Sequence, residues 1–475
     1  MTKEKSRSRK WSDYTVFMRV KLDTPLFVGE ICKATNALPD TSISPMQKIE
    51  AVCTDSRECL EGDLFIALCG EHESGEKYVE NATEKNCISI TTKKHRQAMQ
   101  VTDASQALLD IAKLYKSKTN IRYTVSVTGS VGKSTTVKFL SKILRIKYNV
   151  HSPIGNFNNH LGVPLTILAA KKSTDVLVLE FGMNHENEIS ILSQCAEPNL
   201  GIITSIGTSH IGNLGSRERI AKAKLEITHG MLNGTLLLPY GERLLNNIKN
   251  AVYVGRNTSL SDYSLNNGKD GLLYLRSHNG DILGISFFDS REHLLSDLAF
   301  AISSAQLLGL TDIEIIQGVK SITEADLRQR FIVLDDYTIF DDSYNASLES
   351  ITADLEYLDS LKKPYSAFLG DVFELGEKAK AIHTKIGYTA AKYSLCNLYL
   401  LGNYAHHVAQ GAVEAGMDPS HIFINDDVSS SDISIEHIKR NHISGEVILF
   451  KASHKLRFDK IADKIVENER SEYGQ

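Results

Sequence analysis

A glycine-rich turn between a predicted buried strand and a predicted helix constrains this chain more than any other feature. The strand is the β-branched run 123–127, and the helix spans 135–146 with its apolar side chains on one face. Between them the chain reads Thr128-Gly129-Ser130-Val131-Gly132-Lys133-Ser134-Thr135. Glycines let backbone N–H groups curl around phosphate oxygens, and the helix N-terminus adds a favourable dipole. The turn therefore predicts a site for nucleotide phosphates, with an ordinary strand–turn–helix junction as the alternative.

Two side chains at the end of this turn carry the predicted chemistry. Lys133 would neutralise the β- and γ-phosphates, and the Ser134 hydroxyl would bind Mg²⁺. The usual phosphate-loop pattern places a glycine five positions before Gly132, where this chain has Val127. The loop is therefore predicted to be a shortened variant.

Two further polar residues follow neighbouring apolar strands. Glu180 ends the strand 176–179, and a carboxylate at the C-terminal edge of a sheet is well placed to bind Mg²⁺ directly or through water. Taken alone, Glu180 is as well explained as a helix cap. His210 comes after the strand 201–204, and a lone histidine is more often a structural residue than a ligand. Both assignments therefore depend on their context.

The order of strands and helices predicts an α/β protein. Continuous apolar strands alternate with helices from 119 to about 325, which indicates a parallel sheet covered on both faces. After residue 330 the alternation starts again, with strands at 337–340, 366–369, 398–401, 421–424 and 447–450. This second unit is predicted to be Rossmann-like, with ligands beyond the carboxyl ends of its strands.

Charge and cysteine content argue against several classes of protein. The net charge of −5 gives no general attraction to nucleic acid or to an anionic membrane surface. The first ten residues carry five basic side chains, but no apolar run of the kind that a signal peptide needs follows them. We therefore predict a disordered tail over 1–20 and no membrane insertion. Seven scattered cysteines without a Cys-x-x-Cys pair favour reduced thiols in a cytoplasmic protein.

From about residue 25 to its end the chain resembles the Mur ligase family. No single motif is decisive, but their order is that of the family. The segments that carry the resemblance are 55–57, 62–68, the phosphate loop, 155–164, 179–184, 206–210, 223–227, 341–346, 370–371 and 374–376.

The resemblance implies three domains and a role for each. A small mixed α/β domain at 21–118 would hold a uridine nucleotide, and a central domain at 119–325, built like a P-loop ATPase, would hold ATP. A Rossmann-like ligase domain at 326–475 would complete the site and close over it. A monomer is expected.

The resemblance also implies a set of catalytic and metal-binding residues. Ser134 and Glu180 match ligands of a Mg²⁺ ion that bridges the β- and γ-phosphates, and His210 matches a ligand of a second Mg²⁺. Lys224 matches a lysine that the family carbamylates, with a solvated helix lysine as the alternative. Arg330 matches an arginine that reaches the phosphates of ATP.

Further residues are implied to bind ATP or the acceptor substrate. Asp342, Tyr344 and Asn345 match the loop that closes over the nucleotide. The implied substrate-binding residues are Ser56 and Arg57 for the uridine nucleotide, Asn156, Asn158 and Asn159 along the sugar–peptide, and Asp371 and Lys451 near the reaction centre.

The implied activity is ATP-dependent amide ligation through an acyl phosphate, in peptidoglycan precursor synthesis. The branch that the chain most resembles adds D-alanyl-D-alanine to UDP-N-acetylmuramoyl-tripeptide. One alternative is a ligase of this family that adds a single amino acid to another acceptor. Another is a nucleotide-binding module without turnover.

Three positions depart from the family pattern near the nucleotide. Val131 stands where a polar residue is usual, and Leu294 and Asp297 replace two asparagines that help to seat the adenine end of ATP. Because an aspartate still accepts a hydrogen bond from an exocyclic amine, Asp297 is expected to bind ATP with altered affinity.

Overall fold

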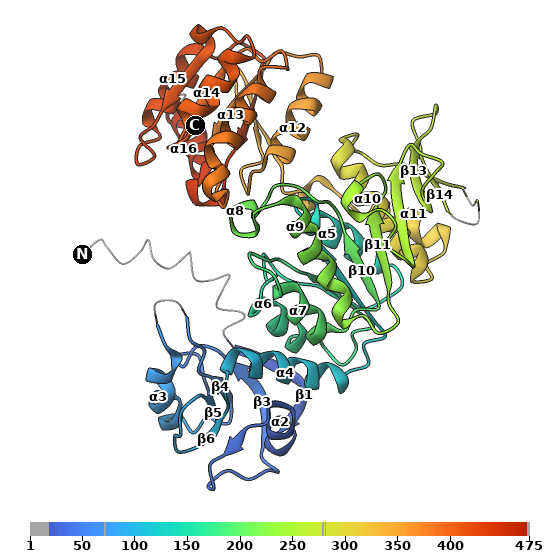
Figure 1. Ribbon diagram of the computed structural model, residues 1–475, viewed down its shortest axis with the longest axis vertical. Helices are drawn as coiled ribbons and strands as arrows, with labels where there is room; N and C mark the ends of the chain where they lie inside the picture. The colour runs from blue at the N-terminus through green and yellow to red at the C-terminus, as the bar shows by residue number, and fades with distance from the viewer. Residues whose placement is uncertain (1–18, 71–72, 278–279, 281, 473–475) are drawn as a thin grey trace.

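The computed structural model describes residues 19–70, 73–277, 280 and 282–472, which form three sheets with their own helices (Figure 1). The three units follow one another along the long axis, with the unit that carries the phosphate loop in the middle (Figure 1). The predicted α/β fold with three units is confirmed.

The first unit is a mixed six-stranded sheet in the order β1-β3-β4-β5-β6-β2. Strands β3 to β6 are parallel, whereas β1 and β2 pair antiparallel at the two edges. Its elements are β1 (Arg19–Phe27), α2 (Val28–Thr35), β2 (Leu38–Pro39), β3 (Lys48–Cys53), β4 (Leu64–Ile66), η1 (Gly75–Tyr78), α3 (Val79–Glu84), β5 (Ile88–Thr91), β6 (Ala98–Gln100) and α4 (Ala104–Ser117).

The middle unit has a nine-stranded sheet in the order β15-β14-β13-β12-β11-β10-β7-β9-β8. Its strands are β7 (Tyr123–Thr128), β8 (Val150–His151), β9 (Val176–Glu180), β10 (Leu200–Ile203), β11 (Thr235–Pro239), β12 (Ala251–Arg256), β13 (Tyr263–Asn267), β14 (Leu273–Arg276) and β15 (Ile282–Ile285). A parallel sheet was predicted here, and the pairings from β8 to β13 are parallel, but β13 with β14 and β14 with β15 pair antiparallel. Short hairpin connections replace the helical crossovers in this part, so these strands add to the sheet edge without a helix between them.

Helices cover both faces of the middle sheet because alternate strand residues point to opposite faces. On β9, Val176 and Val178 belong to the core under α5, α10 and α11, while Leu177 and Leu179 belong to the core under α6, α7 and α9. The helices are α5 (Lys133–Leu144), α6 (Gly162–Leu168), α7 (Glu188–Ala196), α8 (Ile211–Leu214), α9 (Arg217–Leu225), η2 (Glu226–Gly230), η3 (Arg243–Leu245), α10 (Glu292–Leu307), α11 (Asp312–Lys320) and η4 (Glu324–Asp326).

The C-terminal unit is a six-stranded sheet in the order β16-β17-β21-β18-β19-β20, parallel except for β16. Helices α12, α13 and α14 pack on one face and α15 and α16 on the other. The elements are β16 (Arg330–Val333), β17 (Thr338–Asp341), α12 (Leu348–Ser360), β18 (Tyr365–Gly370), η5 (Gly376–Lys378), α13 (Ala379–Ala390), β19 (Leu398–Leu401), α14 (Ala405–Glu414), η6 (Pro419–His421), β20 (Ile422–Asn425), α15 (Asp432–Asn441), β21 (Val447–Lys451), η7 (His454–Leu456) and α16 (Phe458–Glu472).

Helix α4 attaches the first unit to the middle one. The Tyr115 hydroxyl donates to the carbonyl oxygen of Ala170 at 2.6 Å, and Lys116 Nζ donates to the carbonyl oxygen of Ala196 at 2.6 Å. A buried tyrosine and a largely buried lysine that both find backbone acceptors fix the orientation of the two units.

The domain limits 21–118, 119–325 and 326–475 stay predictions. Strand β1 begins at Arg19, so Arg19 and Val20 belong to the first sheet and not to the predicted tail, whose other residues lie outside the described range. No helix among the described residues has the length and apolar character needed to cross a membrane.

Candidate active site

A cavity of about 780 Å³ lies between the middle and C-terminal units. None of the described residues before position 119 lines it. Most of the predicted site residues do: Ser130, Val131, Gly132, Lys133, Ser134, Thr135, Asn156, Asn158, Asn159, Glu180, His210, Asp297, Asp342, Tyr344, Asn345 and Lys451. The structure thus brings together side chains that are as many as 321 positions apart (Ser130 to Lys451).

The phosphate loop follows β7 and ends at the first turn of α5. Gly129 and Gly132 have φ values of +154° and +89°, a region that side chains other than glycine rarely adopt. Lys133 folds back over the loop and donates from Nζ to the carbonyl oxygen of Gly129 at 2.7 Å. Thr128, predicted to bind ATP, instead donates its buried hydroxyl to the carbonyl oxygen of Phe181 at 2.9 Å and holds the end of the strand.

The segment after β10 forms hydrogen bonds with the backbone of the phosphate loop. The Val131 amide donates to the Ser205 hydroxyl at 2.9 Å, and the Ser130 amide donates to the Ser205 carbonyl oxygen at 3.0 Å. The Thr204 hydroxyl donates to the carbonyl oxygen of Val131 at 2.5 Å. Val131 is therefore held through its backbone, so the loss of a polar side chain at this position leaves the loop fold intact.

The side chains of Ser134 and Glu180 contact each other next to the phosphate loop. The Ser134 hydroxyl donates to Glu180 Oε2, and Asn158 Nδ2 donates to Glu180 Oε1 at 2.8 Å. Glu180 is buried at the end of β9. Asn159 accepts from the amides of Leu161 and Gly162, so its side-chain oxygen caps α6 while the residue still lines the cavity.

Asp297 lies directly under the phosphate loop. The Thr136 hydroxyl donates to Asp297 Oδ1 at 3.2 Å, and a Cβ at position 132 would overlap that same carboxylate oxygen. Only 6% of Asp297 is exposed, and burial raises the pKa of its carboxyl group well above the ordinary value. Asp297 therefore supports the loop as well as lining the cavity, and Leu294 lines the same wall.

Lys224 is buried within the middle unit on α9. Its side chain makes no hydrogen bond or ion pair with any residue that the structure describes, and only 2% of it is exposed. Burial, helped by the positive charge of Lys133, lowers the pKa of Lys224 well below its ordinary value. A solvated helix lysine is thus excluded, and a neutral amine is favoured.

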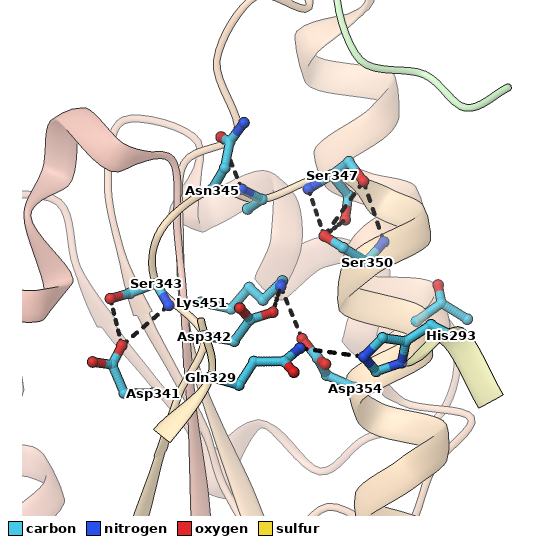
Figure 2. Close-up of polar contacts among 12 residues, drawn as sticks. His293, Gln329, Asp341, Asp342, Ser343, Asn345, Ser347, Ser350, Asp354 and Lys451 are labelled. Carbon is cyan, nitrogen blue, oxygen red and sulfur yellow. Dashed lines mark hydrogen bonds and ion pairs between the residues drawn. The ribbon is translucent and has the colours of Figure 1, made fainter. Parts of the chain in front are cut away.

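Figure 2 shows the C-terminal wall of the cavity, where Lys451 lies between Asp342 and Asp354. Lys451 Nζ forms an ion pair with Asp342 Oδ2 and a second one with Asp354 Oδ2 at 2.9 Å. Burial alone would lower the pKa of Lys451, but the two carboxylates outweigh it and raise this pKa to about 12. Burial and the neighbouring Asp342 raise the pKa of Asp354 to about 8. His293 lies beside this cluster, 3.3 Å from Gln329 Nε2.

Arg328, and not Arg330, reaches the phosphate loop. Arg328 Nη2 donates to the Ser134 hydroxyl at 2.6 Å, and its guanidinium carbon lies 3.8 Å from the ring centroid of Tyr344. Arg330 is on β16, where Nε donates to Asp341 at 2.7 Å and Nη2 to Asp463 at 3.4 Å. The predicted position of Arg330 at the phosphates is therefore wrong for this structure, because the edge strand carries its side chain to the other partners.

Three of the predicted substrate-binding residues lie outside the cavity. Asp371 is buried and accepts from the amides of Asn403 and Tyr404 at 2.9 and 3.0 Å, so it holds the turn before α14. Ser56 and Arg57 belong to a turn after β3 in the first unit, where Lys85 Nζ donates to both of their carbonyl oxygens at 2.8 Å. Their proposed nucleotide site is thus separate from this cavity.

The oxygen donors at the loop suit Mg²⁺. Ser134 Oγ and Glu180 Oε2 already contact each other, so one cation can bind both, and carboxylate and hydroxyl oxygens are the ligands that Mg²⁺ prefers. No group of three or more His, Cys, Asp and Glu side chains able to hold a metal occurs among the described residues. Phosphate oxygens, water or a modified lysine would have to supply the remaining ligands.

The cavity residues that had not been predicted from the sequence include four polar side chains of its walls, Arg328, Gln329, His293 and Asp354. Arg328 is two positions from Arg330, the arginine that was predicted to reach the phosphates. The presence of two arginines in this segment was the one indication in the sequence that Arg328 could take that place. Asp354 interrupts the apolar face of α12, and an acid at a core position is the one signal that could have identified it.

Comparison with known proteins identifies the family. The Mur ligase middle domain matches residues 127–293. The UDP-N-acetylmuramoyl-tripeptide–D-alanyl-D-alanine ligase of Bacillus subtilis is 31% identical over 93% of this chain and 98% of its own length. The ligase of the same name from Synechocystis is 29% identical over 90% of this chain and 94% of its own length.

Solved structures agree with this result. The chain superposes on a crystal structure of MurF from Acinetobacter baumannii with a TM-score of 0.84 and 25% identity, covering 94% of this chain and 100% of that one. MurF ligase from Thermotoga maritima in complex with ADP shares the fold, with a TM-score of 0.77 and 24% identity over 89% of this chain and 98% of that one. Identity and coverage of this order, together with a phosphate loop at the cavity, show that the chain belongs to the Mur ligase family of ATP-dependent ligases.

Proposed function

We propose that this chain uses ATP to join D-alanyl-D-alanine to UDP-N-acetylmuramoyl-tripeptide in peptidoglycan precursor synthesis. The observation that carries the proposal is one cavity in which Lys133, Ser134 and Glu180 of the middle unit face Arg328 of the segment leading into the C-terminal unit. The relatives named for this reaction match nearly the whole chain.

The first step activates the acceptor carboxylate. A carboxylate does not condense with an amine at neutral pH because oxide is a poor leaving group. Its oxygen attacks the γ-phosphorus of ATP, an O–P bond forms, the bond from the γ-phosphorus to the β-phosphate oxygen breaks, and ADP leaves. The product is an acyl phosphate. This step needs positioning and charge neutralisation more than a protein nucleophile.

The residues around the loop fit that requirement. Lys133 and Arg328 make no ion pair with any described residue, so their charges are available for the phosphates. Glycines at 129 and 132 let the backbone approach the phosphate chain. Ser134 and Glu180 would hold a Mg²⁺ ion, which when bound would neutralise charge on the β- and γ-phosphate oxygens.

Lys224 would contribute after modification. A neutral lysine amine attacks CO₂, an N–C bond forms, and a proton is released to give a carbamate. The lowered pKa of Lys224 favours the neutral amine that this reaction needs. The carbamate would place a negative charge near the phosphate site, where His210 and a second Mg²⁺ are proposed to lie.

The second step forms the amide. The amine of D-alanyl-D-alanine attacks the acyl carbon, a C–N bond forms through a tetrahedral intermediate, and phosphate leaves while the amine loses its proton. Water would hydrolyse the acyl phosphate, so closure of the C-terminal unit over the cavity would protect the intermediate. Asn156 and Asn158 on the cavity wall are proposed to contact the sugar–peptide, and Ser56 and Arg57 the uridine end. We also propose that the enzyme acts in the cytoplasm, because ATP and nucleotide-linked precursors are available in that compartment. We propose that it acts as a monomer.

The test is ADP release by the full chain with each amine in turn. Release that depends on D-alanyl-D-alanine and on the tripeptide acceptor is expected, with both diaminopimelate- and lysine-containing acceptors supplied. Stimulation by single amino acids alone would favour the other ligase branch. Lys133→Ala and Glu180→Ala should each abolish product, and undiminished turnover in either would contradict the phosphate and metal assignments.

A further inference from the structure

The segment that carries Arg328 crosses from the middle unit to the C-terminal unit. It lies between η4 and β16, and from there Arg328 reaches the Ser134 hydroxyl. Among the residues that the structure describes, the backbone groups of Arg328 and Gln329 make no hydrogen bond to another backbone group. Because backbone hydrogen bonds do not fix these two residues, their position depends on side chains.

The side chain of Gln329 ties this segment to the middle unit. Its Oε1 accepts from Arg291 Nη1 at 2.7 Å, and its Nε2 lies 3.3 Å from Nε2 of His293, as Figure 2 shows for the second contact. Burial lowers the pKa of His293 to about 4, so the ring is neutral and has a nitrogen that accepts from the Gln329 amide. Both ends of the Gln329 side chain are therefore bound at the start of α10.

Arg291 is a rigid anchor for this contact. Only 2% of its side chain is exposed, and Nε and Nη2 donate to the carboxylate of Asp289 at 3.0 and 2.6 Å. Its guanidinium carbon lies 5.6 Å from the ring centroid of Phe340 on β17 and 5.3 Å from that of Tyr357 on α12. A side chain of the middle unit is thus packed against two aromatic rings of the C-terminal unit. The planar guanidinium, with five donors, binds these partners in one fixed orientation.

Helix α10 connects this anchor to the phosphate loop. Besides the residues that bind Gln329, α10 carries Asp297, which lies under Gly132 of the loop. The same helix therefore supports the loop at one point and holds Gln329 at another. The position of Arg328 relative to the loop is set through α10.

We propose that Gln329 is a positioning residue for Arg328: bound to Arg291 and His293, it fixes the segment between the two units so that the Arg328 guanidinium faces the phosphates of ATP. The inference rests on the proposed function, in which Arg328 neutralises charge on those phosphates. A displacement of about 1 Å in a group that positions or stabilises the reacting atoms costs about 100-fold in rate. Two hydrogen bonds that never touch the substrate thereby control the reaction.

The experiment is a double-mutant cycle in the full chain. Gln329→Met removes both hydrogen bonds at nearly equal length, Gln329→Glu keeps an oxygen that accepts from Arg291, and each is combined with Arg328→Ala. Lys378→Met is the matched control, because Lys378 Nζ donates to the carbonyl oxygen of Gly215 between the same two units but outside this segment. The readouts are kcat/KM for ATP in amide formation and the Kd of a non-hydrolysable ATP analogue.

Gln329→Met should lower kcat/KM for ATP about 10–100-fold when Arg328 is present. It should cause no further loss in Arg328→Ala, because it acts through that arginine. Gln329→Glu should lose less than Gln329→Met, Lys378→Met should keep the wild-type value, and the affinity for the analogue should follow the same order. Equal losses from Gln329→Met in the two backgrounds, no advantage of Gln329→Glu, or an equal loss in Lys378→Met would overturn the proposal.

A second variant keeps the test decisive if Gln329→Met does not fold. Arg291→Lys then takes its place in the cycle, since a single ammonium group cannot hold Asp289 and Gln329 in the fixed geometry of a guanidinium. Non-additive losses in analogue affinity, from a wild type that forms no amide with any amine, would support the positioning role and count against the proposed function instead.

Discussion

Replacement of Asp297 by asparagine should stabilise the middle unit, increasingly so as the pH rises. Asp297 is buried under Gly132 with the Thr136 hydroxyl as its hydrogen-bond partner. Burial raises the pKa of its carboxyl group, and the Thr136 hydroxyl and the charge of Lys133 offset only part of that effect. Asparagine has nearly the same shape and carries no charge at any pH, so it tests the electrostatic effect alone.

The sign follows from proton binding. Above the unfolded pKa of about 3.9 the unfolded chain releases the Asp297 proton, whereas the folded chain keeps it up to the raised folded pKa. The folded state therefore binds more protons, and the free energy of unfolding falls by up to about 1.4 kcal/mol for each pH unit in that window. The asparagine side chain of the variant would not titrate. From about pH 4 upward, the difference in the free energy of unfolding between the variant and the wild type should therefore grow by up to about 1.4 kcal/mol for each pH unit.

Hydrogen exchange of the α5 amides measures this locally. These residues pack on α10, which carries Asp297, and their intrinsic exchange rates are equal in both proteins at a given pH. The ratio of wild-type to variant rates should rise by up to about tenfold for each unit between pH 5 and pH 7. Asp312→Asn, at an exposed position in α11, should give a flat ratio. A flat ratio in Asp297→Asn as well would mean that Asp297 is ionised in the folded protein, and the burial argument would fail.

Three further experiments, which use four substitutions, test the site. Arg328→Ala should lower kcat/KM for ATP about 100-fold or more, as the loss of a charge-stabilising group does, whereas Arg330→Ala should lower it much less. A larger loss in Arg330→Ala than in Arg328→Ala, measured by steady-state assays, would restore Arg330 as the arginine that reaches the phosphates of ATP. Gly132→Ala should raise the KM for ATP about tenfold, since a Cβ would meet Asp297 and φ is positive; an unchanged KM would show that the loop can adapt. Removal of CO₂ should lower wild-type activity at neutral pH and leave the residual activity of Lys224→Ala unchanged, and a CO₂-independent wild type would exclude the carbamate.

Much of the fold could be predicted because its signals are local. The strand 123–127 and the glycine turn after it are readable from β-branching and from the spacing of Gly129 and Gly132, and the structure has β7 and α5 in those places. The antiparallel extension β13–β15 could not be predicted. Its strands are short, and the direction of a strand depends on the length of its connections more than on its own residues.

Sequence reasoning could not predict which side chains contact each other when they lie far apart in the chain. Arg328 and Arg330 lie in one segment, and which of them meets Ser134 depends on where the chain turns into β16. Asp371 illustrates the same limit. The family resemblance implied a substrate contact for Asp371, whereas the turn before α14 uses both of its carboxylate oxygens.

The distribution of charge around the cavity indicates where an anionic substrate binds. Lys133 and Arg328 make no ion pair with any described residue, while Lys451 is held between Asp342 and Asp354. Moving Lys451 toward a substrate would leave two buried acids without their cation, which costs several kcal/mol. Lys133 and Arg328 stay free of carboxylate partners among the described residues, whereas the cation of the C-terminal wall is neutralised, so we expect the phosphates of ATP to bind at Lys133 and Arg328. Lys451 is better placed to fix Asp342, and with it the loop that carries Tyr344 and stacks on Arg328, than to bind the acceptor directly.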